Sequence, residues 1–305
     1  MYTNQLPVNA FLAHLRRQSV PELLDGECLK ALDRVEEQYG DLQSFGAGLE
    51  VRLGSPERYA DYILCTMDDS LFPNAVTFLE MDYRSYRGPG EIRPCLFLNT
   101  WDADKAENPD EYWDFVLNVF AGQNRAENLR ETFHAILDHL PGDVQIKQIG
   151  SMARPGEADS LRVVLLFSEV KQVPETLAKI GWPGDAAALG TALEPWDDAH
   201  RLGVNIDLDG AGIREKTGIE VYPYWKHPVL VNKMISRLEK AGLCREDKGQ
   251  ALRRWVRIPP DQNPFMQTLI SHYKLNYADG QITEAKAYLE QSPFPKHRFF
   301  EHAEK

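Results

Sequence analysis

Residues 202–224 read LGVNIDLDGAGIREKTGIEVYPY, two alternating segments around a glycine-rich bend. Apolar side chains occupy every second position from Leu202 to Leu208, which is typical of a β-strand with one buried face. The segment Gly218–Tyr224 alternates in the same way, and Asp209-Gly210-Ala211-Gly212 supplies the turn residues between the two. These residues are therefore predicted to form a β-hairpin with an apolar face and a polar face.

The same alternation predicts four more strand pairs, spaced along the chain at intervals of roughly 50 residues. These pairs are Gly48–Leu53 with Arg58–Met67, Ala75–Tyr83 with Ile92–Trp101, Val144–Ile149 with Leu161–Phe167, and Leu269–Tyr277 with Glu284–Leu289. Apolar residues at helical spacing fill the intervals, at Pro21–Phe45, Pro109–His139, Pro174–Ile180, Asp185–Leu193, and Pro228–Ala241 continuing to Val256.

Five hairpins that alternate with helices predict an α+β protein. Parallel βα repeats would place single strands between helices, so a TIM barrel or a doubly wound sheet fits poorly. Antiparallel pairs with one apolar face require helices on that face. About ten strands that close into a barrel, with helices outside and an interior wide enough for a ligand, satisfy both conditions. We expect one domain over residues 1–305.

Composition excludes several classes of function. The 305 residues carry a net charge of −12, which argues against a surface for nucleic acid. No stretch reaches the length of a membrane span, and the N-terminus lacks the order of a secretory signal. The four cysteines are scattered, which is typical of free thiols in a reducing compartment. A cytoplasmic protein that does not act on a membrane is therefore expected.

The polar faces of the strands hold the candidate functional residues. If the apolar faces meet the helices, the polar faces point into the barrel. The cations there are Lys147, Arg162, Lys274 and Lys286, with Arg52 near them; Tyr222 and Tyr288 lie beside them, and the other polar residues are Glu50, Asn205, Asp207, Glu220 and His272. We expect one half of the interior to be cationic and the other acidic. The alternative is an ordinary sheet whose polar face is solvated.

Three segments carry a resemblance to a known family. They are the strand start Gly48-Leu49-Glu50-Val51, the strand Ile219-Glu220-Val221-Tyr222, and Val144–Phe167 with the helix after it. Together with the five αββα repeats, they resemble the ABBA prenyltransferases, and within that group the chain is most similar to the cyanobactin-type peptide prenyltransferases. The likeness covers nearly the whole chain in order and spacing.

The resemblance implies that an isoprenyl group, dimethylallyl or geranyl, moves from its diphosphate to a side chain of a ribosomally made, cyclic peptide. Glu50 would be the catalytic base. Mg²⁺ would accompany the diphosphate, with no protein residues as metal ligands. Arg52, Lys147, Arg162, Lys274, Lys286, Tyr222 and Tyr288 would hold the diphosphate, and Asp207, Glu220, Asn205 and His272 would contact the acceptor.

The chemistry of allylic transfer suits these residue types. The leaving diphosphate needs fixed cations, and the allylic cation needs aromatic faces and exclusion of water. Inward carboxylates and negative net charge favour a cationic acceptor, such as an arginine side chain. Two alternatives stay open: a small-molecule aromatic prenyltransferase, and an inactive barrel that binds a peptide or a lipid. A monomer is expected.

Overall fold

The structure is a computed structural model, which describes residues 5–18, 20–67, 76–100, 108–121, 123–152, 160–223, 228–256 and 266–293. Three ends of the expected strands, Ala75, Trp101 and Tyr224, lie outside the described residues. Contacts divide the chain into two compact units. Unit 1 comprises Met1–Pro94, Trp225–Ser271 and Lys286–Lys305, and unit 2 comprises Cys95–Tyr224 and His272–Ala285. The prediction of one domain over 1–305 stays a prediction.

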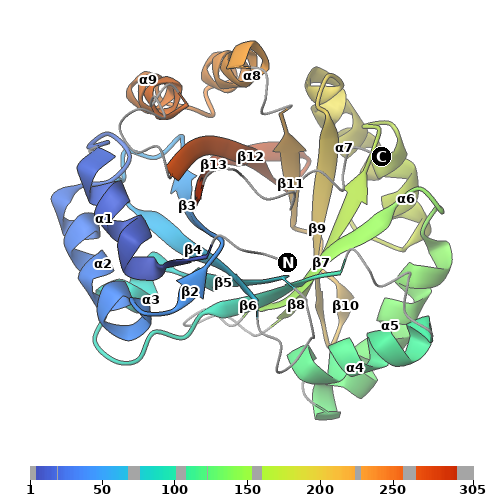
Figure 1. Ribbon diagram of the computed structural model, residues 1–305. Helices are drawn as coiled ribbons and strands as arrows, with labels where there is room; N and C mark the ends of the chain where they lie inside the picture. Colours follow the sequence, from blue (N-terminus) through green and yellow to red (C-terminus); the bar gives the residue numbers. More distant parts are fainter. Residues whose placement is uncertain are drawn as a thin grey trace. The chain divides into compact units, whose positions relative to one another are not determined.

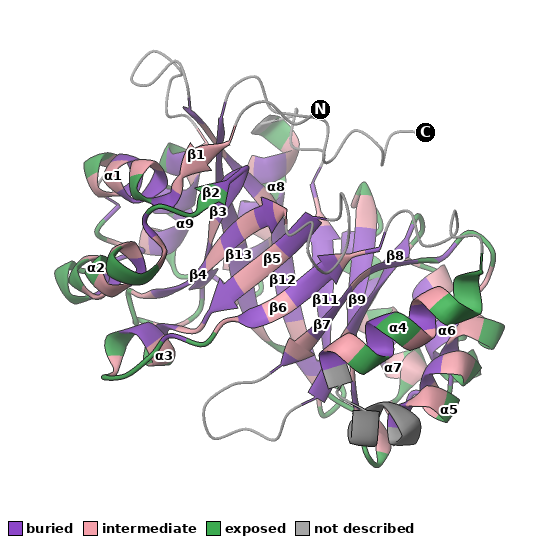
Figure 2. Ribbon diagram, turned by 60° about the horizontal axis from the view of Figure 1, so that its bottom comes forward, coloured by how far each residue is buried: buried purple, intermediate pink, exposed green. Residues whose placement is uncertain are grey.

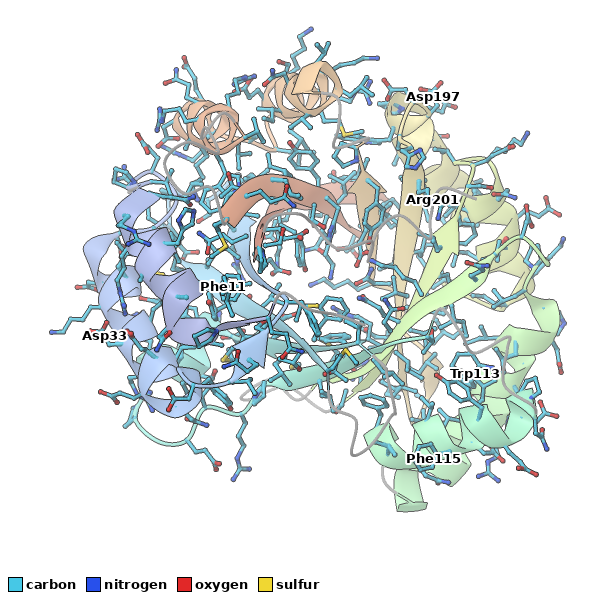
Figure 3. All side chains as sticks on the ribbon, in the orientation of Figure 1. Phe11, Asp33, Trp113, Phe115, Asp197 and Arg201 are labelled. Carbon is cyan, nitrogen blue, oxygen red and sulfur yellow. The ribbon has the colours of Figure 1, made fainter. Side chains whose placement is uncertain are left out.

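Unit 1 places helices on one side of its strands (Figure 1). Its elements are β1 (Leu6–Pro7), α1 (Val8–Gln18), α2 (Gly26–Tyr39), β2 (Gln43–Ser44), β3 (Gly46–Arg52), β4 (Ala60–Met67), β5 (Val76–Met81), α3 (Tyr83–Arg87), α8 (Pro228–Lys240) and α9 (Glu246–Trp255). Phe11 of α1 is fully buried, whereas the side chain of Asp33 on α2 is exposed (Figure 3). The amphipathic helices therefore cover the apolar face of the strands.

Unit 2 has the same layering, with α4–α7 beside β7–β9 (Figure 1). Its elements are β6 (Cys95–Asn99), α4 (Pro109–Ala121), α5 (Gln123–His139), β7 (Gln145–Met152), β8 (Ser160–Phe167), α6 (Gln172–Lys179), α7 (Ala186–Leu193), a 3₁₀ turn (Glu194–Trp196), β9 (Arg201–Asp209), β10 (Gly212–Ile213) and β11 (Thr217–Tyr222). Strands β12 (Met266–Ala278) and β13 (Gln281–Pro293) contribute residues to both units.

The strands form an antiparallel barrel. Hydrogen-bonded neighbours follow the order β9-β11-β12-β13-β3-β4-β5-β6-β7-β8, and β8 pairs with β9 to close the sheet. The strand pairs whose registers are described in this sheet are antiparallel, and β10 is a short strand beside β9. The five predicted strand pairs and the closed α+β barrel are thus confirmed over the described residues.

Register separates the two faces of each strand. In unit 1, Leu49 pairs with Tyr62, which lies within electrostatic range of Arg16 on α1 and Glu36 on α2. The next pair along, Glu50 with Asp61, must point the opposite way. We call this the inner face, meaning the face of the sheet away from the helices. Buried and less buried residues alternate along several strands (Figure 2).

Several predicted boundaries are wrong. The helix expected over Pro21–Phe45 spans only Gly26–Tyr39, because Asp25 caps its start by accepting from the backbone N–H of Cys28 at 2.8 Å. An additional helix, α1, precedes it. The strand expected to reach Tyr83 ends at Met81, since Asp82 caps the short helix α3. The helical segment expected over Pro109–His139 consists of two helices, α4 and α5.

Candidate functional site

The inner face of unit 1 presents the predicted base, Glu50, in a buried hydrogen-bonded cluster. Glu50 lies on β3 and is only 3% exposed. One carboxylate oxygen accepts from the ammonium group of Lys286 and the other from the hydroxyl of Tyr288, both on the neighbouring strand β13. The ion pair stabilises the ionised form of a carboxylate that burial alone would disfavour. Both oxygens therefore have fixed donors.

Asp61 is a second buried carboxyl group beside Glu50. It is the cross-strand partner of Glu50 on β4, and its Oδ1 accepts from the backbone N–H of Tyr83 at 2.8 Å. Burial, with the nearby charges of Glu50 and Glu80, raises the pKa of Asp61 to about 8. At neutral pH this carboxyl is therefore protonated, and it has an O–H group to donate.

The raised pKa of Asp61 makes stability depend on pH. Below about pH 4 both the folded and the unfolded chain hold the proton, and above about pH 8 neither does. Between these values only the folded chain holds it, so the free energy of unfolding should fall as pH rises from about 4 to about 8. Asp61→Asn mimics the protonated group and keeps an acceptor for the Tyr83 N–H.

We expect Asp61→Asn to be more stable than wild type at pH 8 by at least about 2 kcal/mol, with no such gain below pH 4. Urea unfolding at a series of pH values measures this. Asp41→Asn, an exposed substitution, serves as the control. An equal effect of Asp61→Asn at pH 4 and pH 8 would show that Asp61 does not titrate in this window.

Lys147 reaches the inner face of unit 2 through a β-bulge. The register of β7 against β8 shifts between Ile146 and Gln148, which leaves Lys147 as the extra residue. Its ammonium lies 3.2 Å from Oε2 of Glu220, donates to the hydroxyl of Tyr222, and lies 4.6 Å from the centre of that ring. Lys147 therefore lies on the same face of the sheet as Glu220 and Tyr222.

Glu220 is at the centre of the unit 2 cluster. Its Oε1 accepts from Nδ2 of Asn205 at 2.9 Å, and its Oε2 accepts from Lys147 and from the hydroxyl of Tyr222. Burial alone would raise the pKa of this carboxyl. Positive charge outweighs burial, first from Lys147 and then from His272 and Lys274, and holds the pKa of Glu220 well below its ordinary value. This carboxylate is ionised at any working pH.

A second ion pair lies on the adjacent strands of unit 2. Arg162 on β8 and Asp207 on β9 are register partners, and two parallel bonds of 2.7 and 2.8 Å join the guanidinium to the carboxylate. Burial would raise the pKa of Asp207, but the charge and hydrogen bonds of Arg162 lower it overall. A fork of this kind fixes both side chains.

The predicted site residues thus fall into two groups. The structure brings Glu50, Lys286 and Tyr288 together in unit 1, and Lys147, Asn205, Glu220 and Tyr222 together in unit 2, where Tyr222 and His272 also form a ring contact at 4.9 Å. Arg52 is the register partner of Lys286, and it also lies 4.0 Å from Glu57 and 5.9 Å from the ring of Tyr59. Each group contains a cation paired with a carboxylate, so neither group is purely cationic or purely acidic.

Sequence reasoning missed Asp61, Glu80 and the role of two glycines. Asp61 and Glu80 lie on strands that read as mostly apolar, so their shared face follows only from the register. A Cβ on Gly203 would lie 2.8 Å from Oε2 of Glu220, and one on Gly218 would lie 2.6 Å from Cε of Lys274. Each glycine leaves the space that a long charged side chain from the next strand occupies.

No group of three or more acidic, histidine or cysteine side chains that could hold a metal ion occurs in the described part of the chain. Mg²⁺ prefers to keep water and phosphate oxygens as ligands. Mg²⁺ therefore stays an expectation attached to the donor. Within the same ranges, no helix is both long and apolar enough to cross a membrane.

Solved structures with this fold are known. The 5-dimethylallyltryptophan synthase from Streptomyces coelicolor matches with a TM-score of 0.57 and 13% identity, covering 96% of this chain and 99% of that one. The prenyltransferase PriB, in a ternary complex with L-tryptophan and dimethylallyl thiolodiphosphate, matches with a TM-score of 0.56 and 11% identity, covering 93% and 96%.

A third match is the 6-dimethylallyltryptophan synthase from Micromonospora olivasterospora, with a TM-score of 0.52, 14% identity and 81% of each chain covered. No family model matches the sequence, and no curated protein does. At these identities the likeness establishes the fold, which is the barrel of the ABBA prenyltransferases.

Proposed function

We propose that this protein transfers an isoprenyl group from an isoprenyl diphosphate to an acceptor that loses a proton. The observation that carries the proposal is the buried carboxylate of Glu50, fixed by Lys286 and Tyr288 on the inner face of a prenyltransferase-type barrel. The neighbours whose fold it shares include proteins solved with a dimethylallyl thiolodiphosphate and tryptophan. A general base on a rigid strand is the component that such a transfer requires.

The roles of the residues follow from the bonds that change. The carbon–oxygen bond of the donor breaks, and its electron pair leaves with the diphosphate. An electron pair of the acceptor forms the new bond to the allylic carbon, and the acceptor's proton passes to Glu50. The cations of unit 2, Lys147, Lys274 and Arg162, are assigned to the departing diphosphate. Mg²⁺, when bound to the donor, would add charge neutralisation.

For the acceptor we propose an arginine side chain in a peptide. The carboxylates of Glu50 and Glu80 both lie within electrostatic range of Asp61 in unit 1. Negative potential of this kind, together with the net charge of −12, attracts a cationic group. A second candidate is tryptophan itself, because two of the neighbours were solved with that amino acid bound.

Mass spectrometry after incubation with dimethylallyl or geranyl diphosphate and Mg²⁺ separates these acceptors. The panel is a cyclic peptide with one arginine, the same peptide with citrulline, and free L-tryptophan. We expect one isoprenyl group to be added to the arginine peptide and none to the citrulline peptide. Modification of tryptophan alone would establish the second candidate, and no modification of any acceptor would contradict prenyl transfer.

A further inference from the structure

Glu220 receives the set of donors that an anionic ligand would need. The ammonium of Lys147, the amide of Asn205 and the hydroxyl of Tyr222 all point at its two oxygens, and the charges of His272 and Lys274 act on it. Only 5% of Glu220 is exposed. Cations, an amide and a tyrosine hydroxyl are also the groups that bind phosphate oxygens in proteins.

The backbone around Glu220 is shaped to admit this carboxylate. Glu220 and Gly203 are register partners on β11 and β9, and a Cβ on residue 203 would lie only 2.8 Å from Oε2 of Glu220. On β11 itself, Gly218 leaves room for the stem of Lys274 in the same manner, with a distance of 2.6 Å. The carboxylate and the cations around it therefore occupy space that the glycines provide.

We propose that Glu220 is an internal anion, which occupies the place of a diphosphate oxygen among the cations of unit 2 and competes with the donor for them. This rests on the proposed function, in which those cations bind an isoprenyl diphosphate. The ion pair of Lys147 with Glu220 is the closed form of the anion site. Donor binding transfers Lys147 and Tyr222 from the carboxylate to the diphosphate.

The neutral variant Glu220→Gln tests this directly. Glutamine keeps an acceptor and the length of the side chain but removes the competing charge. Titration calorimetry with inorganic pyrophosphate, and separately with dimethylallyl thiolodiphosphate, should show binding to the variant at least about tenfold tighter than to wild type. The control is Glu175→Gln, which removes the same charge from an exposed position on α6 of the same unit and keeps an acceptor for Lys179. Its affinity should stay within about twofold of wild type, as for an independent charge in salt.

A second variant keeps the charge and moves it. Gly203→Ala places a methyl group against the Glu220 carboxylate and should displace it, so pyrophosphate should again bind more tightly than to wild type. If Glu220→Gln shows no cooperative thermal transition and is therefore not folded, Gly203→Ala tests the proposal in its place. Weaker or unchanged binding by the folded variants, or no binding of pyrophosphate to them, would overturn the proposal and make Glu220 a structural organiser of the cations.

These binding measurements are independent of transfer. Tighter binding of pyrophosphate by Glu220→Gln, combined with no isoprenyl addition to any acceptor by wild type, would retain the competing anion and reject the proposed function. Addition of the isoprenyl group by wild type, combined with weaker pyrophosphate binding by Glu220→Gln, would retain the proposed function and reject the competing anion.

Discussion

Replacing Glu50 by glutamine is expected to lower the rate of prenyl transfer by about 100- to 10 000-fold, the range that loss of a general base produces. Glutamine keeps one oxygen to accept from Lys286, and its amide N–H can donate to the hydroxyl oxygen of Tyr288, while the proton acceptor is lost. The measurement is the initial rate of isoprenyl addition to the acceptor under saturating donor.

The control for Glu50→Gln is again Glu175→Gln, which removes an exposed carboxylate on α6. We expect that control to transfer at the wild-type rate. Affinity for dimethylallyl thiolodiphosphate should be nearly unchanged in Glu50→Gln, because Glu50 is assigned to the acceptor's proton and not to the diphosphate. A variant that retains full transfer, or one that loses donor binding instead, would remove Glu50 from the role of base.

Replacing Lys147 by methionine is expected to destabilise the fold by about 3–5 kcal/mol, because it leaves the buried carboxylate of Glu220 without its principal cation. Methionine keeps most of the apolar stem, so the loss is electrostatic rather than a cavity. The measurement is the free energy of unfolding in urea near pH 7.

The double variant Lys147→Met with Glu220→Gln separates the two causes. Removing the carboxylate removes the unpaired charge, so most of the lost stability should return. If the double variant is no more stable than Lys147→Met alone, the charge of Glu220 is not the source of the loss. Removal of the exposed ion pair between Lys179 and Glu175 should change the free energy of unfolding by under about 1 kcal/mol. This surface pair is the comparison for the buried pair of Lys147 with Glu220.

Alternation was sufficient to predict most strands, because each has one face against helices. The polar residues of β11 and β12, such as Glu220 and Lys274, alternate without interruption, and the register makes these two residues partners. The boundary of the second predicted strand pair was less accurate, since Asp82 caps a short helix in a segment whose alternation predicts a strand through Tyr83. A cap of one residue is a weak signal in a strand-like context.

The candidate site was only partly predictable. Glu50 and Lys286 come from opposite ends of the chain, and their contact depends on the pairing of β3 with β13, which no local pattern encodes. The bulge at Lys147 arises from a register shift between two strands and has no signature in one of them. Asp61 gives no signal of its raised pKa until Glu50 and Glu80 are placed beside it.

The activity proposed for this barrel is cleavage of an isoprenyl diphosphate with transfer of the isoprenyl group to an acceptor. The most direct test incubates wild type with dimethylallyl diphosphate carrying ¹³C at the allylic carbon, Mg²⁺ and the acceptor panel, and measures pyrophosphate release and labelled acceptor together. We expect pyrophosphate and labelled acceptor to appear in equal amounts, and both to be lost in Glu50→Gln. Pyrophosphate released without any labelled acceptor, or no release with any acceptor, would contradict it.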